Sequence, residues 1–168
     1  ITMMYAADHA GVKYGEYATD YRVLVASQIA IANDYDFDFV SCISDPAREA
    51  TDCGAHVQVF ENQPPAIVEE DALLADKQGL ASLRMPDPRA EGRMLDRVRA
   101  AALFREKVGD SKLIEGWIEG PCAEAADLRG INTLMIDFFD DPDFVRDLFE
   151  FTLQLGIWFA RAQVEAGA

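Results

Sequence analysis

Apolar residues along the chain form short continuous runs, and stretches with helical spacing separate these runs. Three runs have the length and the closing loop signals of buried strands: residues 1–7, 37–43 and 112–118. Apolar positions recur at helical spacing over four further stretches: residues 16–32, 46–53, 93–108 and 121–128. Because strands alternate with helices, the pattern predicts an α/β fold with a parallel sheet wrapped by helices.

Several element boundaries carry specific signals. Pro46 stands in the first turn of the 46–53 helix, and Gly54 follows its end. Residues 56–60 alternate like a further strand, and Pro64-Pro65 interrupts regular structure after it. Asp141-Pro142 predicts the start of a long amphipathic helix. The apolar stripe of that helix comprises Phe144, Leu148, Phe151, Leu155, Trp158 and Ala162.

The overall charge restricts the partners of the chain. Its 168 residues include 15 Lys and Arg against 30 Asp and Glu, a formal net charge of −15. Such a charge repels nucleic acid and anionic membrane surfaces. No apolar run reaches the roughly 20 residues that a membrane helix needs. We therefore expect no nucleic-acid partner and no membrane association.

The cysteines and histidines give no metal or disulfide pattern. Cys42, Cys53 and Cys122 are an odd number without a C-x-x-C pair, so we expect a reducing, cytoplasmic location. No H-E-x-x-H, G-x-G-x-x-G or Walker motif occurs. His56 lies inside an alternating segment and is interpreted as structural. We therefore predict no metal ligand within this chain.

Acidic residues follow the three predicted inner strands, where parallel α/β folds bind their ligands. The candidates are Asp8 with His9, then Asp45, then Glu119. Acids that converge at one mouth raise each other's pKa unless they share a proton, a metal ion or a cation. Two alternatives stay open. Asp45 precedes Pro46 in the position of a helix cap, and a loop histidine such as His9 is as often structural as ligand-binding.

An ordered set of short segments resembles the uroporphyrinogen decarboxylase superfamily, which includes the decarboxylase and cobalamin-linked methyltransferases. The segments are, in chain order, 37–45, 49–54, Pro64-Pro65, 119–121, 127–130, 141–145 and 163–168. The resemblance implies a (β/α)8 TIM barrel of about twice this length. The chain opens on an apolar run and stops after a helix. We therefore expect residues 1–168 to form one partial domain, the first half of a barrel, which cannot close by itself.

The loop after the first predicted strand separates the two branches of the superfamily. In the decarboxylase this loop has the form R-Q-A-G-R, and its arginines hold the carboxylates of the substrate. The matching stretch here runs from Asp8 to Val12 and has lost both arginines. The family aspartate that contacts the pyrrole nitrogens matches Asp45, whereas the family tyrosine falls at Ala126. A tetra-anionic substrate is therefore disfavoured in this acidic chain.

The resemblance instead implies a methyltransferase that moves a methyl group between a corrinoid and a thiol or tetrahydrofolate acceptor. It also implies Zn2+ that makes a thiol nucleophilic, with ligands expected outside this chain. We expect Asp45 to be catalytic and Asp8, His9 and Glu119 to bind substrate. The expected partners are a small-molecule substrate, a corrinoid protein, and the second half of the barrel or another copy of the chain. The decarboxylase and a non-catalytic half-barrel that only binds a partner are the alternatives.

Overall fold

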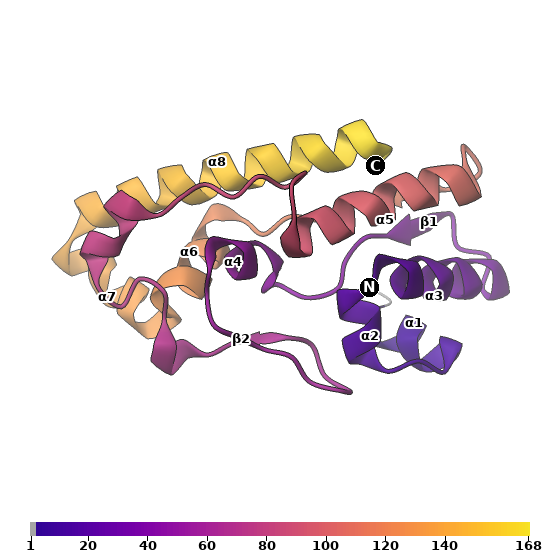
Figure 1. Ribbon diagram of the computed structural model, residues 1–168, viewed down its shortest axis with the longest axis horizontal. Coiled ribbons are helices and arrows are strands. Elements are labelled where there is room, and N and C mark those ends of the chain that lie inside the picture. The colour runs from indigo at the N-terminus through magenta and orange to yellow at the C-terminus, as the bar shows by residue number, and fades with distance from the viewer. Residues whose placement is uncertain (1–2) are drawn as a thin grey trace.

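The structure is a computed structural model that describes residues 3–168. Its α-helices are α1 (Met3–Ala10), α2 (Tyr14–Thr19), α3 (Tyr21–Asp34), α4 (Arg48–Cys53), α5 (Gly92–Val108), α6 (Pro121–Arg129), α7 (Ile131–Asp140) and α8 (Pro142–Ala166). The strands are β1 (Phe39–Ser41), β2 (Val57–Gln58), β3 (Ala66–Ile67) and β4 (Leu113–Glu115). Two 3-10 helices, η1 (Glu69–Asp71) and η2 (Lys77–Ser82), lie between β3 and α5. Figure 1 shows α5 and α8 running side by side, with α4 and α6 beneath them.

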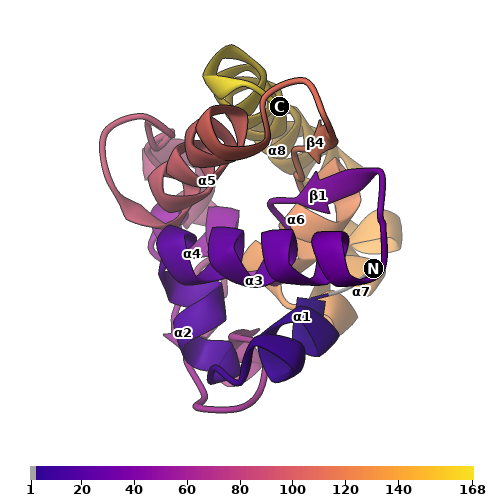
Figure 2. The same cartoon turned by 90° about the vertical axis from the view of Figure 1, so that its right-hand side faces the viewer.

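The strands form two separate sheets of two strands each. β1 and β4 pair in parallel, with Phe39 opposite Leu113 and Ser41 opposite Glu115. Because parallel neighbours need a long crossover, the chain passes through α4, the second sheet and α5 before β4 begins. Figure 2 shows this strand pair with α3 and α5 near it. The parallel pair and its covering helices confirm the predicted α/β class.

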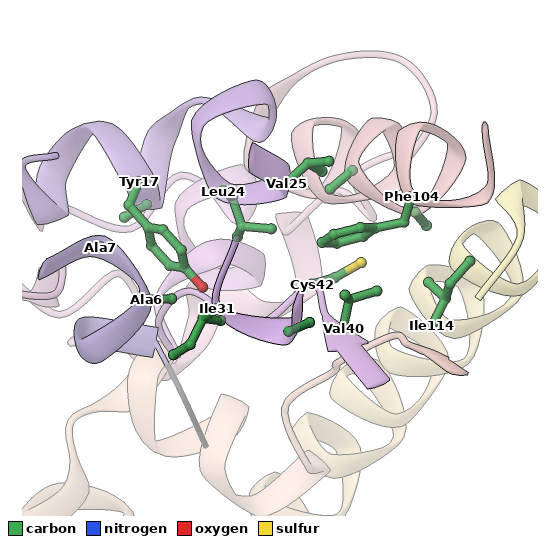
Figure 3. Packing of buried hydrophobic residues seen from close by; sticks show 14 of the residues in the cluster. Ala6, Ala7, Tyr17, Leu24, Val25, Ile31, Val40, Cys42, Phe104 and Ile114 are labelled. Carbon is green, nitrogen blue, oxygen red and sulfur yellow. The ribbon is translucent and has the colours of Figure 1, made fainter. Parts of the chain in front are cut away.

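Among residues 3–168, two large apolar cores and a smaller one between α5 and α8 hold the helices in place. The first core joins α1, α2, α3 and α5 to β1 and β4. Figure 3 shows Leu24 and Phe104 gathered beside Val40 and Cys42, and all four side chains are fully buried. Burying an aromatic side chain such as Phe104 stabilises the fold by about 2–3 kcal/mol. The second core lies between α4, α6, α7 and α8.

The start of α5 is capped by a residue from another helix. Its N-cap residue, Glu91, makes no side-chain bond to the helix. Instead, the Asp52 carboxylate at the end of α4 accepts the N–H groups of Arg93 at 2.7 Å and Met94 at 2.8 Å. Gly92 has φ +88°, and a Cβ there would overlap that carboxylate. The contact therefore joins α4 to α5 and requires glycine at position 92.

The first predicted strand is wrong over the part that the structure describes. Residues 3–10 form α1, whereas residues 1 and 2 lie outside the described residues. Ala6 and Ala7 are both buried against α3, while Met4 and Tyr5 are half exposed. A strand would place neighbouring side chains on opposite faces, whereas a helix can bury two neighbours together. A short apolar run is compatible with either element, and the packing of small alanines against α3 selects the helix.

Three further expectations are refined by the structure. The 16–32 helix is divided at Asp20, whose carboxylate accepts the Arg22 N–H at 2.8 Å and caps α3. Residues 56–60 contribute only β2, which pairs antiparallel with β3 outside the parallel sheet. The predicted stripe of α8 is largely buried, but Trp158 is 44% exposed.

The long C-terminal helix has 25 residues. Asp141 caps it by accepting the Phe144 N–H at 3.2 Å, and Pro142 occupies its first turn, as the sequence predicts. Neither this helix nor any other within residues 3–168 combines the length and apolar character needed to cross a membrane.

Candidate active site at the carboxyl ends of β1 and β4

The loops that leave β1 and β4 begin next to each other because the two strands are paired in parallel. The Cys42 N–H donates to the Glu115 carbonyl at 2.9 Å, which extends the pairing past the end of β1. The first loop leads into α4 and carries Asp45. The second loop leads into α6 and carries Glu119. Both predicted acids therefore come from the same end of the sheet, where ligands of such folds bind.

Asp45 is enclosed by protein groups. Its side chain is fully buried, and Oδ2 lies 2.6 Å from an Arg93 nitrogen of α5. Its Oδ1 accepts the Ala47 N–H at 3.2 Å, a bond within the loop before α4, whose N-cap residue is Ala47 and not Asp45. Arg93 also donates to the Ala18 carbonyl at 3.0 Å. Asp45 thus joins the loop after β1 to α5 and α2, and a catalytic role for it stays a prediction.

Two tyrosines of α2 hold the same loop from the other side. Tyr14 donates its hydroxyl hydrogen to the Ser44 carbonyl, and Tyr17 donates to the Ile43 carbonyl at 3.1 Å. Both rings are buried, and burial raises the pKa of Tyr17 to about 12. Both hydroxyls are therefore neutral donors near pH 7, so the loop main chain is fixed by two hydrogen bonds.

A buried ionic cluster connects the two loops. Arg48 of α4 pairs with Glu49 at 3.3 Å and with the Glu119 carboxylate at 3.7 Å. The other oxygen of the Glu49 carboxylate accepts the Glu119 N–H at 2.9 Å. The side chains of Arg48 and Glu49 are 0% and 2% exposed, whereas that of Glu119 is 18% exposed. Of these three groups, Glu119 is the one that solvent or a ligand can reach.

Two acids of α6 add negative charge to this cluster. Glu124 is buried, and its two oxygens find no hydrogen-bond partner within residues 3–168. Burial raises its pKa well above the ordinary value, and the charges of Glu49 and Asp127 raise it further. Burial and the Glu119 charge also raise the pKa of Asp127 to about 7. One arginine cannot offset this many carboxylates, so the surrounding negative charge favours the protonated form of Glu124.

Asp8 and His9 are not at the end of a strand, which corrects the placement on which their predicted role depended. Both belong to α1, and Nε2 of His9 lies 2.7 Å from the carboxylate of Asp34, the last residue of α3. Because α3 leads into β1, this pair lies at the amino end of that strand, opposite to Asp45. The geometry gives no support to substrate binding by either residue, and that role stays a prediction.

The described part of the chain does not fit a zinc ion. Among residues 3–168, no group of three or more His, Cys, Asp and Glu side chains could hold a metal ion. Cys42 is packed in the first core, and burial raises its pKa to about 12, so it is a neutral thiol. We therefore assign no chemical step to Zn2+ in this chain, and the expectation of ligands elsewhere stays a prediction.

The profile of the family described as "Uroporphyrinogen decarboxylase (URO-D)" matches residues 1–168. The chain belongs to the uroporphyrinogen decarboxylase family. Among solved structures, a methyltransferase from Methanosarcina mazei is similar, with a TM-score of 0.88 and 23% sequence identity. The match covers 99% of this chain and 49% of that chain, so this chain spans about half the length of that structure. No curated protein matches the sequence significantly.

These comparisons confirm the predicted fold, half of a (β/α)8 barrel of the uroporphyrinogen decarboxylase family. The sequence interpretation missed four functional candidates in this family member: Arg48, Glu49, Arg93 and Glu124. All four lie on helices that the spacing predicts, but no local motif marks them as functional. One available signal was the i, i+3 spacing of Glu124 and Asp127 on the helix directly after a strand end, which puts both acids on one face.

Proposed function

We propose that the protein that contains this chain is a methyltransferase. In this proposal it moves a methyl group between a corrinoid and a thiol or tetrahydrofolate acceptor. Family membership and the similar fold of the Methanosarcina mazei methyltransferase support the reaction class. The corrinoid is a substrate here, brought to the mouth by a corrinoid protein. The second half of the barrel, or another copy of the chain, completes the mouth.

The observation that carries the proposal is the charge at the carboxyl ends of β1 and β4. Four carboxyl groups gather there: Glu49, Glu119, Glu124 and Asp127. The neighbouring cations are enclosed, because Arg48 pairs with Glu49 and Arg93 pairs with Asp45. A substrate that carries several carboxylates needs accessible cations, which these two arginines do not offer. This charge disfavours porphyrinogen decarboxylation, so methyl transfer is the reaction class of the family that remains.

In this function the residues of the two loops have different tasks. Asp45 shapes the mouth by holding Arg93, since its own carboxylate is fully buried. Glu119 supplies the carboxylate that contacts the acceptor, because its side chain is partly exposed at the strand end. An acceptor that is held in line with the methyl donor reacts faster, because its translational and rotational entropy is lost on binding and not in the displacement step.

The test uses the full-length protein with methylcobalamin as the donor. The acceptor is either 2-mercaptoethanol or tetrahydrofolate, and mass spectrometry measures the methylated product while visible absorption follows loss of methylcobalamin. We expect acceptor-dependent transfer and no coproporphyrinogen from uroporphyrinogen. Decarboxylation on the order of one turnover per second or faster would establish the decarboxylase instead. The absence of both reactions would favour the non-catalytic half-barrel.

A further inference from the structure

Arg48 and Glu49 form a buried pair that hydrogen bonding does not satisfy. The three guanidinium nitrogens of Arg48 are buried and make no hydrogen bond to any residue among 3–168. The closest carboxylate oxygens, from Glu49 and Glu119, are at 3.3 and 3.7 Å. The Phe159 ring centre lies 6.0 Å from the guanidinium carbon, so the pair rests on an apolar residue. The Arg48 guanidinium is therefore shielded from water, and no well-formed hydrogen bonds replace those that it makes to water in the unfolded chain.

Such a pair contributes little to stability. Desolvation of two buried charges usually offsets their attraction, and well-packed apolar residues of similar volume serve at least as well. Incompletely satisfied buried polar groups are rare, and strongly perturbed charged groups concentrate at functional sites. Arg48 and Glu49 lie between the loops that follow β1 and β4. This location therefore indicates a functional role at the carboxyl ends of these strands.

We propose that Glu49 and Arg48 are positioning residues that hold Glu119 in place, an inference that rests on the proposed function. Glu49 fixes the main chain of residue 119 through the 2.9 Å bond from its N–H. Arg48 draws the Glu119 carboxylate towards α4. The next residue, Gly120, is exposed and has no side chain that could restrain the loop before α6 begins. The two contacts from α4 therefore determine where the Glu119 carboxylate meets its ligand.

The first experiment measures amide hydrogen exchange at Glu119 in the full-length protein, independently of any substrate. Glu49→Ala removes the acceptor of the Glu119 N–H, so we expect exchange to become roughly tenfold faster or more. Glu49→Gln keeps an amide oxygen that accepts the same N–H, so protection should be retained. Unchanged exchange in Glu49→Ala would overturn the proposal. If Glu49→Ala does not fold, Glu49→Gln is compared with a folded Arg48→Lys variant instead. Equal exchange at the Glu119 amide in these two variants supports the hydrogen bond to residue 49. Loss of protection in Glu49→Gln overturns the proposal.

The second experiment is a double-mutant cycle on methyl transfer from methylcobalamin. Glu49→Ala should lower kcat/KM about tenfold in the natural background and less than about twofold in a Glu119→Gln background, because Glu49 acts through Glu119. Asp52→Ala is the control, since it removes a half-buried carboxylate of α4 whose hydrogen bonds go to Arg93 and Met94 and not to Glu119. An equal loss in both backgrounds, or an equal loss in the control, would show a merely structural role.

The two tests separate failure of this inference from failure of the proposed function. If the natural protein transfers no methyl group to either acceptor, the proposed function fails. The exchange measurement then decides alone whether Glu49 positions residue 119. If transfer occurs and the cycle is additive, the methyltransferase stands and the positioning role is wrong.

Discussion

Removal of the Asp52 carboxylate should weaken the junction between α4 and α5. Asp52 accepts the N–H groups of Arg93 and Met94, which have no partner within their own helix because they lie in its first turn. In Asp52→Ala both bonds are lost, and the backbone of the buried Met94 has no replacement from the solvent side. We therefore expect a lower free energy of unfolding without a change of fold.

The magnitude follows from the two bonds. Loss of a helix N-cap costs about 0.5–2 kcal/mol, and an unsatisfied buried N–H costs about 1–3 kcal/mol. We expect about 2 kcal/mol for Asp52→Ala. Gly92→Ala adds about 1–2 kcal/mol of backbone strain at φ +88° and also displaces the Asp52 carboxylate, for a total of about 3 kcal/mol.

The assay is urea denaturation of the full-length protein, followed by circular dichroism, for the two single variants and the double variant. Because Gly92→Ala already removes the cap, the double variant should lose about 3 kcal/mol and not the sum of about 5 kcal/mol. Asp52→Asn keeps one acceptor oxygen and should lose less than Asp52→Ala. A change in midpoint at constant m-value shows that stability alone has changed.

Additive losses to within about 0.5 kcal/mol would refute the reasoning, because they would mean that position 92 and the Asp52 carboxylate do not share one space. A loss below about 0.5 kcal/mol for Asp52→Ala would likewise show that α5 is capped by other means.

Two further predictions concern the mouth. The pKa of Asp127 is raised from 3.8 to about 7, so the folded state holds the proton more tightly and stability falls as pH rises between these values. Asp127→Asn should therefore increase the free energy of unfolding at pH 8 and leave it unchanged below about pH 4. Denaturation midpoints at both pH values test this, and an equal effect at both would contradict it. Asp45→Asn keeps an acceptor for the Ala47 N–H but removes the charged partner of Arg93, so it should lower stability by about 2–4 kcal/mol. A melting temperature within about 1 °C of the natural protein would show that this ion pair contributes little.

Local signals in the sequence predicted most helices of this chain and the two strands β1 and β4 of the parallel pair. Gly54 ends α4 with φ +102°, and Asp141 with Pro142 begins α8, because caps and turns depend on residues within a few positions of each other. The alternation of apolar runs with helical spacing also predicted the α/β class and the convergence of Asp45 with Glu119. These features are decided by backbone preferences and by side-chain period, which a sequence displays directly.

Tertiary packing decided the rest of the fold and the site. The sequence allowed residues 3–10 to be a strand or a helix, and the close packing of Ala6 and Ala7 against α3 selected the helix. Arg48 and Glu49 meet Glu119 about seventy positions along the chain, and only the parallel pairing of β1 with β4 brings them together. The raised pKa of Glu124 has the same origin, because desolvation and neighbouring charge arise when separate elements pack and not from residue type or spacing.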